Sequence, residues 1–353
     1  MSKALVINGQ HRSGTNMLAR LIGSQPNIIC MTGIFEMLKI IASMRGVGDK
    51  NVIVRENFEA SPNVFTEKSH HILRSKLLDS YAGEILAMVA HPHYVGDGSD
   101  KVYGLTLNEL FAAIPVIANH EPVNDLGGLM SAVGEKLGIK VFGSKWASGH
   151  NYANTFLKSP DAYWLEIIRN PYAVRASEEL RGGPKTWSNL KDHEDALKFA
   201  KSFKHERMLV IRYEDLCIET EKTTAEISAW LGETIKPTEL TNPRGGKFVP
   251  MTSYHRLDGN SHEIQDQSMS NEIGSLDLER WRKTYTARDM AFLNAAVDFH
   301  GLYEKEPVDA ASRAYAASRM AKMQAINAVR PIVRGAFNLA GFDIYRSPPK
   351  VTI

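Results

Sequence analysis

The chain has little of what marks several large classes of protein. Its 353 residues include two cysteines, too few for a disulfide framework or a cysteine-rich metal site. No stretch approaches the ~18 consecutive apolar residues that a membrane-spanning helix needs. The formal net charge is only +2, which argues against binding to nucleic acid through overall charge. No basic segment followed by an apolar stretch precedes the first strand-like run, so we expect a cytoplasmic protein.

What the sequence does have is a strand–loop–helix pattern near its N-terminus. A β-branched run ends at Asn8, the loop is bounded by Gly9 and Gly14, and an apolar helical pattern begins at Met17. Such a turn directs backbone N–H groups and the positive end of the helix dipole at one point, which suits an anion. The glycines are spaced as in a nucleotide P-loop, but the lysine after Gly14 is absent and the cation is Arg12, inside the loop. The loop therefore predicts a site for a phosphate or sulfate ester that differs from an ATP site.

Nearly continuous apolar runs predict four strands that are covered on both faces. Helical patterns separate these strands, which is typical of a parallel sheet. We predict an α/β fold, a P-loop-like parallel sheet flanked by helices, in which ligands bind at the carboxyl ends of the strands. The strands are expected at Ala4–Asn8, Ile139–Gly143, Tyr163–Arg169 and Arg207–Tyr213, and the helices at Met17–Ile22, Pro122–Lys136, Tyr172–Leu180, His193–Phe203 and Lys222–Leu231.

Two further segments complete the expected domain, which spans residues 1–305. A long, mostly helical insertion follows the first strand–loop–helix unit, over about residues 34–138, and is expected to shape the acceptor side of the site. Within it, amphipathic helices are expected at Phe65–Ala90 and Leu107–His120. Residues 241–275 are rich in Gly, Pro, Asn and Ser and predict a long loop.

The C-terminal tail, residues 306–353, is expected to be a basic helical extension. Between Ala310 and Phe342 there are basic residues but no acidic one. Two interpretations are open: an amphipathic helix that docks on an anionic membrane or an acidic partner, or a helix packed on the body or on a second subunit. In either case Pro331 is expected to break or kink the helix.

A second informative run joins a strand to a helix. The strand ends on Arg169, Pro171 sets the turn, and the following helix carries Ser177. An arginine fork at the end of a strand and a hydroxyl two helical turns onward can converge on one phosphate. A third run, residues 207–216, is a strand that ends in Arg-Tyr-Glu-Asp before another helix.

Taken together, these segments resemble the sulfotransferase superfamily that uses 3′-phosphoadenosine 5′-phosphosulfate. The loop at residues 11–16 resembles the family's 5′-phosphosulfate loop, and the run from Arg169 to Ser177 resembles its 3′-phosphate motif. The Arg-Tyr-Glu-Asp-Leu run and the Arg-Trp-Arg at residues 280–282 are similar to later landmarks of the family. One departure is Asn16, where the family usually has a second threonine or a serine; an asparagine amide still donates to an oxyanion.

The resemblance implies the transfer of a sulfuryl group from 3′-phosphoadenosine 5′-phosphosulfate to a hydroxyl or amine, without a metal. The implied acceptor is a small molecule, a carbohydrate or a lipid. Negative charge grows on the leaving 5′-phosphate, and Arg12 with the loop amides is placed to stabilise it. The residues that the resemblance assigns to the donor are Arg12, Ser13, Gly14, Thr15, Asn16, Arg169, Ser177 and Tyr213.

Three residues are candidates for the proton transfer and for charge compensation at the sulfuryl group. Glu36 lies just past the first helix, where several sulfotransferase branches place a catalytic glutamate, and partial burial would raise its pKa toward the working range. It could instead be a structural carboxylate paired with an arginine, and His11 is the alternative base. Lys145 resembles the lysine of a family segment and could bridge the sulfuryl oxygens, or be a solvated lysine at a strand end. Tyr213 could orient the loop through its hydroxyl, or be a buried tyrosine.

Two other classes of function are weighed against this one. A small-molecule kinase or another P-loop NTPase with an atypical loop would need magnesium, which Glu214 or Asp215 would have to hold. A non-catalytic relative would keep the fold as a binding module. The lysine missing after Gly14, with Arg169 and Ser177 in place, favours the sulfotransferase.

Overall fold

The structure is a computed structural model that describes residues 1–31, 101–102, 105–121, 125–147, 149–179, 188–237 and 278–339. Glu36, the helix expected at Phe65–Ala90 and the loop expected at 241–275 lie outside these residues. The chain divides into two compact units. The first comprises Met1–Asn170 and Asp195–Leu278, and the second Pro171–Glu194 and Glu279–Ile353.

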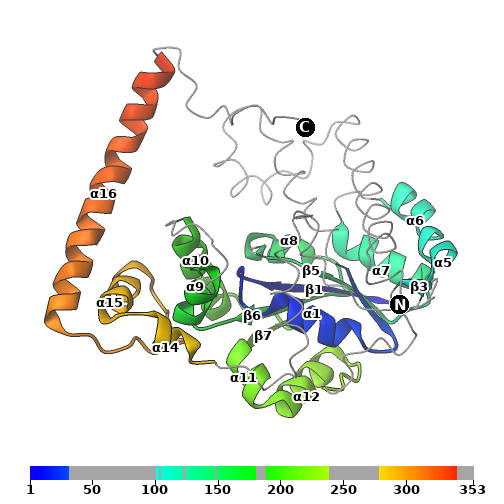
Figure 1. Ribbon diagram of the computed structural model, residues 1–353. Helices are drawn as coiled ribbons and strands as arrows, with labels where there is room; N and C mark the ends of the chain where they lie inside the picture. Colours follow the sequence, from blue (N-terminus) through cyan, green and yellow to red (C-terminus); the bar gives the residue numbers. More distant parts are fainter. Residues whose placement is uncertain are drawn as a thin grey trace, which may run out of the picture. The chain divides into compact units, whose positions relative to one another are not determined.

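A parallel five-stranded sheet is the centre of the first unit (Figure 1). The strand order β2-β5-β1-β6-β7 puts the first strand in the middle. Apolar side chains on both faces of the central strands are buried, as the continuous apolar runs predict. The four expected strands are confirmed, and a short fifth one, β2, is added. The strands are β1 Lys3–Gly9, β2 Ile28–Met31, β5 Val141–Lys145, β6 Ala162–Ile168 and β7 Met208–Arg212.

Helices cover both faces of the sheet, which completes the α/β fold that the sequence predicts (Figure 1). Alternate residues of β1 enter different layers: Leu5 and Ile7 pack in one, Ala4 and Val6 in the other. The Leu5 layer contains α1 Thr15–Gly23, α11 Tyr213–Ile218 and α12 Thr220–Leu231. The Ala4 layer contains α5 Leu107–Phe111, α6 Ile114–Asn119, α7 Leu126–Lys136 and α8 Ala153–Phe156, which follows the 3₁₀ turn η2 His150–Tyr152.

The single helix expected at Leu107–His120 is two helices. A short hairpin, β3 Lys101–Val102 and β4 Leu105–Thr106, leads into α5, whose first turn is closed by a capping box between Thr106 and Glu109. Pro115 lies in the first turn of α6, where its missing N–H costs no hydrogen bond. The proline therefore starts a new helix where the apolar periodicity alone predicted continuity.

The connections of the sheet change sides between β1 and β6. After β1 the chain passes through α1 to β2 at one edge of the sheet, and after β6 it reaches β7 at the other edge. The last turns of α10 (Ser188–Ser202) pack Phe199 in the layer opposite to α1. In open α/β sheets such a reversal opens a crevice outside the carboxyl ends of the two strands. The loops that follow β1 and β6 lie at this point.

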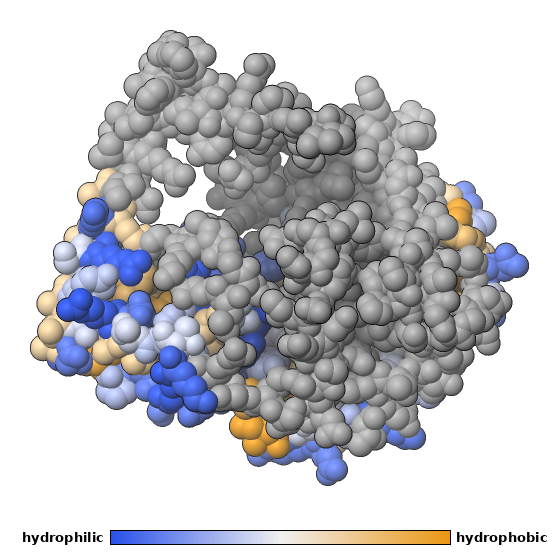
Figure 2. Space-filling model, viewed as in Figure 1, coloured by the Kyte–Doolittle hydropathy of each residue, from blue (hydrophilic) through white to orange (hydrophobic). Residues whose placement is uncertain are grey.

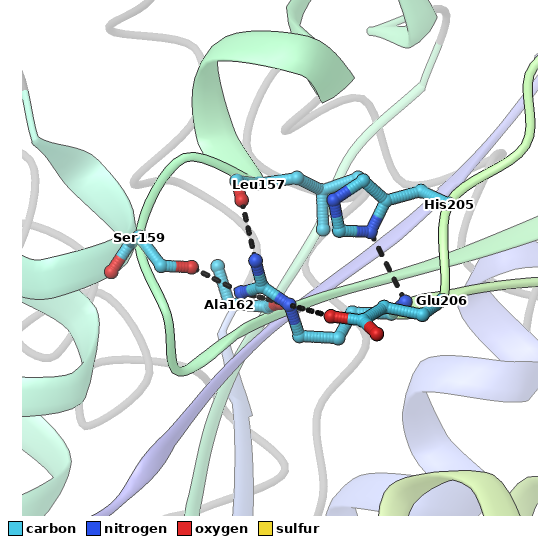
Figure 3. Close-up of polar contacts among 6 residues, drawn as sticks. Leu157, Ser159, Ala162, His205 and Glu206 are labelled. Carbon is cyan, nitrogen blue, oxygen red and sulfur yellow. Dashed lines mark hydrogen bonds and ion pairs between the residues drawn. The ribbon is translucent and has the colours of Figure 1, made fainter.

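Arg207 binds the turn before β6, at the amino-terminal end of the strand; Figure 3 labels Leu157, Ser159 and Ala162, whose carbonyls Arg207 contacts. Its guanidinium donates to the carbonyls of Leu157 at 2.9 Å and Ala162 at 3.2 Å, and also to that of Ser159. These carbonyls follow α8 and have no partner within a helix, so a half-buried arginine that donates to all three stabilises the turn. Arg207 is therefore structural and belongs to the end of the sheet away from the loop between β1 and α1.

The second unit is built around Tyr172 in α9 Pro171–Glu179. Its ring stacks on Trp281 of α14 Arg280–Thr284, with 4.7 Å between the ring centroids. Its hydroxyl donates to Asn294 of α15 Ala287–Ala296 and accepts from the backbone N–H of Glu306 at 2.9 Å. One buried side chain thus joins three helices and the segment that follows them.

The C-terminal helix α16, Ala310–Leu339, packs its first turns on α15. Ser312 and Ala316 are buried, and the Arg319 guanidinium lies 4.2 Å from the ring centroid of Phe292. Hydrophilic residues lie beside small apolar ones along the part of this helix visible in Figure 2. The helix continues through Pro331, so the expected break does not occur there. Among the described residues, none of the helices has the length and apolar character needed to cross a bilayer.

Candidate functional site

The loop between β1 and α1 folds into a tight turn around the side chain of Ser13. The Ser13 hydroxyl donates to the carbonyl of Gln10 at 2.7 Å, and the Ser13 N–H donates to the same oxygen at 3.0 Å. Arg12 and Gly14 both have positive φ, 72° and 98°. Ser13 between them has no positive φ, and backbone angles that alternate in this way turn successive N–H groups toward one side of a loop, which is how backbone amides form a concave anion site.

Gly14 lies directly against the ring of Tyr213. A Cβ at Gly14 would lie 2.2 Å from the tyrosine Cδ2, and a Cβ at Gly9 would lie 2.4 Å from the carbonyl oxygen of Ile167. Both glycines of the loop are therefore required by close packing, and Gly14 also by its positive φ. The ring of Tyr213, from the first turn of α11, packs against the loop at Gly14.

Arg169 joins the end of β6 to this loop. Its Nη1 donates to the carbonyl of Arg12 at 3.0 Å, and its guanidinium carbon lies 4.2 Å from the ring centroid of Tyr213. Its Nε is buried and has no hydrogen-bond partner among the described residues. Leaving a buried guanidinium donor unpaired is unfavourable, so a bound anion would complete the arrangement.

The groups around Arg169 hold it by packing and by charge. Glu214 accepts a hydrogen bond from the backbone N–H of Asn170 at 2.9 Å, which ties the residue after Arg169 to α11. The hydroxyl of Tyr213 and the thiol of Cys217 are hydrogen-bonded to each other, and the ring of Tyr213 contacts the loop at Gly14. Burial raises the pKa of Tyr213, and it raises the pKa of the Cys217 thiol to about 11. Both groups are therefore neutral beside Arg169, and Glu214 is the nearby carboxylate.

The arrangement suits a phosphate or sulfate ester at the N-terminus of α1. Amides of the first helical turn have no partner within the helix, and the first such bond here is from the Leu18 N–H to the Gly14 carbonyl. The carboxyl end of β1 brings these amides beside Arg12, while β6 brings Arg169. Thr15 is buried and Asn16 is half-buried at the start of the helix. Backbone amides and a helix dipole thus lie beside Arg169 and the backbone of Arg12, without a P-loop lysine.

The structure brings together most of the residues that the sequence singled out. Lys145 is the last residue of β5 and pairs in register with Ile7 of β1, so it lies at the same carboxyl edge. Ser177 lies half-buried on α9, in the second compact unit, and Glu36 lies outside the described residues. The residues gathered at the ends of β1, β5, β6 and β7 are Arg12, Ser13, Gly14, Thr15, Asn16, Lys145, Arg169 and Tyr213.

Two other residues that the sequence singled out are Arg282, in the Arg-Trp-Arg run, and His11, the alternative base. Arg282 forms ion pairs with Glu306 at 2.7 Å and Glu279 at 3.2 Å, which agrees with a salt-bridged surface residue better than with an anion ligand. His11 is exposed at the tip of the loop, so its ring is not buried against the turn.

A buried polar chain beside the loop was missed from the sequence. Asn8, at the end of β1, donates to the carboxyl of Glu166 in β6 at 2.8 Å, and Trp164 donates to the same oxygen at 2.9 Å. Asn8 also accepts from the backbone N–H of Gly149 at 2.8 Å. The only signal in the sequence was a single glutamate inside an otherwise apolar strand.

Comparison with protein families gives a match over most of the sheet and its loops. The family described as "Sulfotransferase family" matches residues 4–237, well over half of the chain. This range includes the loop after β1, the ends of β5 and β6, and Tyr213. No curated protein matches the sequence.

Solved structures with a similar chain course include several sulfotransferases. The sulfotransferase domain of the Synechococcus PCC 7002 olefin synthase is 14% identical, with 90% of this chain and 95% of that one covered and a TM-score of 0.45. The sulfotransferase from Alicyclobacillus acidocaldarius is 14% identical, with 80% and 99% covered and a TM-score of 0.35. Sulfotransferase STF9 from Mycobacterium avium is 16% identical, with 68% and 66% covered and a TM-score of 0.33. The assignment of a family depends on the family match alone.

Proposed function

The chain belongs to the sulfotransferase family, and from this premise we propose that its sulfuryl donor is 3′-phosphoadenosine 5′-phosphosulfate. The observation that carries the proposal is the position of Arg169, which contacts the phosphate loop at Arg12 and keeps a buried, unpaired Nε beside it. The Nε–H of Arg169 has no acceptor among the described residues, and the phosphate oxygens of 3′-phosphoadenosine 5′-phosphosulfate would supply one. ATP chemistry would instead call for a lysine after Gly14.

We assign the donor's two phosphate groups to two sets of residues. Arg12 and the amides of residues 13–16 hold the 5′-phosphosulfate, supported by the fold of the loop around Ser13 and Gly14. Arg169 and Ser177 hold the 3′-phosphate, an assignment that comes from the resemblance of their spacing to the family motif. Tyr213 acts through its ring, which supports Gly14 and Arg169.

The donor, when bound, supplies an activated sulfuryl group whose S–O bond to the 5′-phosphate breaks as the acceptor oxygen bonds to sulfur. The protein then has three tasks. Glu36 takes the acceptor proton, Arg12 and the loop amides stabilise the charge on the leaving phosphate, and Lys145 neutralises the sulfuryl oxygens. None of these tasks requires a metal, so we expect chelators to leave the reaction unchanged.

We propose a small-molecule, carbohydrate or lipid acceptor with a hydroxyl or amine. The helices around α5, α6 and α7 belong to the segment that we assign to acceptor recognition. For the tail, packing of α16 on α15 supports the interpretation of a helix held by the body. Membrane contact through its basic residues stays a prediction, which sedimentation with phosphatidylserine vesicles would test.

The decisive experiment is calorimetric titration with adenosine 3′,5′-bisphosphate and, separately, with ATP and magnesium. We expect the wild type to bind the bisphosphate in the presence of a chelator, and the Arg169→Ala variant to lose at least about 10-fold in affinity, because hydrogen bonds to charged groups are strong. Arg313→Ala is the matched control, since Arg313 is exposed on α16. Binding of ATP with magnesium and indifference to the bisphosphate would overturn the donor assignment in favour of a kinase.

The base is tested separately from the donor. Glu36→Gln is expected to abolish sulfuryl transfer and to leave the bisphosphate affinity unchanged, because the amide cannot accept the proton. Unchanged turnover in this variant would remove Glu36 as the base and leave the donor assignment intact. His11→Ala is the companion variant, since His11 is the alternative base.

A further inference from the structure

Glu166 is a fully buried carboxyl that no proposed catalytic step uses. It lies inside β6, on the same face as Trp164, and its exposed fraction is 0%. Its Oε2 accepts from the side chains of Asn8 and Trp164, whereas its Oε1 has no partner among the described residues. Burial raises the pKa of Glu166 to about 7. An apolar residue would serve a purely structural strand better, so this carboxyl needs another explanation.

Asn8 is hydrogen-bonded both to Glu166 and to Gly149, which lies in the loop after β5. The two residues are paired in register between β1 and β6. The Asn8 amide donates to Glu166 through Nδ2 and accepts from the Gly149 N–H through Oδ1, at 2.8 Å each. The side chain is fully buried and cannot turn over without losing both hydrogen bonds. The Oε2 atom of Glu166, which accepts from the amide nitrogen of Asn8, therefore fixes which end of the amide faces Gly149.

The segment that receives this contact follows Lys145 directly. The Trp146 N–H donates to the carbonyl of Ile7 at 2.7 Å, and the Gly149 N–H donates to the side chain of Asn8. Two consecutive residues of β1 therefore hold two points of the segment. Gly149 lies so close to the indole of Trp146 that a Cβ there would be 2.3 Å from its Cδ2. Trp146 and Gly149 are thus held to the last residues of β1 before the loop that begins at Gly9.

We infer that Glu166 is a positioning residue for sulfuryl transfer: through Asn8 it fixes Gly149, which packs on Trp146, and with them Lys145, against the base of the loop after β1. This inference rests on the proposed function, because it assigns the benefit to the placement of Lys145. Small displacements of a charged group at a reaction centre reduce rates steeply. A carboxyl that accepts two hydrogen bonds in a closed network supplies that rigidity.

Variants of Glu166 and Asn8 test the contact from both of its ends. Glu166→Leu removes the acceptor, whereas Glu166→Gln keeps an oxygen that both donors can reach. Asn8→Ala breaks the same chain from the other end, and its unfolding midpoint shows whether any loss is one of folding. Ser144→Ala is the matched control, because the Ser144 hydroxyl is fully buried in the same layer of side chains and has no partner among the described residues.

The first measurement is hydrogen exchange in the peptide that spans Trp146–Tyr152, which needs no substrate. We expect the Gly149 amide to exchange at least about 10-fold faster in Glu166→Leu and Asn8→Ala, because its hydrogen-bond partner is lost. Glu166→Gln and Ser144→Ala are expected to match the wild type. Unchanged exchange in Glu166→Leu or Asn8→Ala would overturn the inference.

The second measurement separates positioning from folding. The probe is sulfate release from 3′-phosphoadenosine 5′-phosphosulfate with water as the acceptor, alongside calorimetry with adenosine 3′,5′-bisphosphate. Glu166→Leu is expected to lower kcat by about 10- to 100-fold with KM and bisphosphate affinity within about 3-fold, and Glu166→Gln to restore the rate. Faster exchange with unchanged kcat, or a Glu166→Gln rate as low as that of Glu166→Leu, would overturn it. Failure of the wild type to bind the bisphosphate would instead count against the proposed function, and the exchange result would still decide whether the contact exists.

Discussion

The guanidinium of Arg169 lies over the ring of Tyr213, 4.2 Å from the ring centroid. The same ring contacts Gly14 on the phosphate loop, so one aromatic side chain supports both the loop and the arginine. The two parts come from strands β1 and β6, and the ring comes from the helix that follows β7. Substitutions of Arg169, Gly14 and Tyr213 therefore test the two contacts of this ring.

Replacing Arg169 by lysine tests whether the planar fork matters. A lysine keeps the charge but cannot stack on Tyr213 while donating to the Arg12 carbonyl and to a bound phosphate. We expect Arg169→Lys to lose about 10-fold or more in affinity for adenosine 3′,5′-bisphosphate by calorimetry. Arg313→Lys, on the exposed part of α16, is the control. Equal affinities in Arg169→Lys and the wild type would show that charge alone suffices.

Replacing Gly14 by alanine tests the contact with Tyr213. Gly138 provides the comparison, because it has φ of 66° and a Cβ added there would meet no atom within 4 Å, whereas Gly14 has φ of 98° and a ring 2.2 Å from the same position. We expect Gly138→Ala to lower the free energy of unfolding by about 1 kcal/mol, the cost of the backbone angle. Gly14→Ala should lose at least about 2 kcal/mol more through overpacking, and bisphosphate binding as well. Urea unfolding measures the loss of free energy in both variants, and equal losses in Gly14→Ala and Gly138→Ala would contradict the packing contact.

Two substitutions of Tyr213 separate its ring from its hydroxyl. The hydroxyl bonds only to Cys217 among the described residues, so Tyr213→Phe should change the free energy of unfolding by about 1 kcal/mol or less and leave bisphosphate affinity intact. Tyr213→Ala removes the support of Gly14 and Arg169 and should lose about 3–5 kcal/mol. Denaturant unfolding and calorimetry test the pair. A large loss of bisphosphate affinity in Tyr213→Phe would show that the hydroxyl contributes to binding.

The buried carboxyl of Glu166 predicts a dependence of stability on pH. Burial raises its pKa from 4.5 to about 7, so between these values the folded protein keeps a proton that the unfolded chain has released. The free energy of unfolding should therefore fall as the pH rises through this window, by about 3 kcal/mol at most. Glu166→Gln should remove that part of the slope in urea unfolding. The indole N–H signal of Trp164, which donates to this carboxyl, should titrate in the wild type.

A parallel pH dependence in wild type and Glu166→Gln would contradict this assignment. An indole signal that stays constant from about pH 5 to 8 would do so independently of stability. The two measurements use different observables, so a disturbance of folding in the variant does not affect the second one.

The strands of the sheet could be predicted because burial on both faces forces continuous apolar runs on a parallel strand. The exception is β2, Ile28–Met31, which is too short for its apolar character to stand out from the helix before it. The helix expected at Leu107–His120 divides in two, since apolar periodicity does not register that Pro115 suits a helix start. Boundaries elsewhere moved by a few residues, as the ends of strands depend on pairing partners.

The sequence by itself determined the strand–loop–helix turn after β1 and the family, because these depend on residues close together in the chain: Gly9, Arg12 and Gly14, and separately Arg169 and Pro171. Only the tertiary structure decided which groups meet. The order of the strands sets β1 beside β6, which brings Asn8 to Glu166 across 158 positions of sequence and Arg169 to Arg12 across 157. Pairing between distant strands is chosen by the packing of the whole core, and no local pattern of residues encodes it.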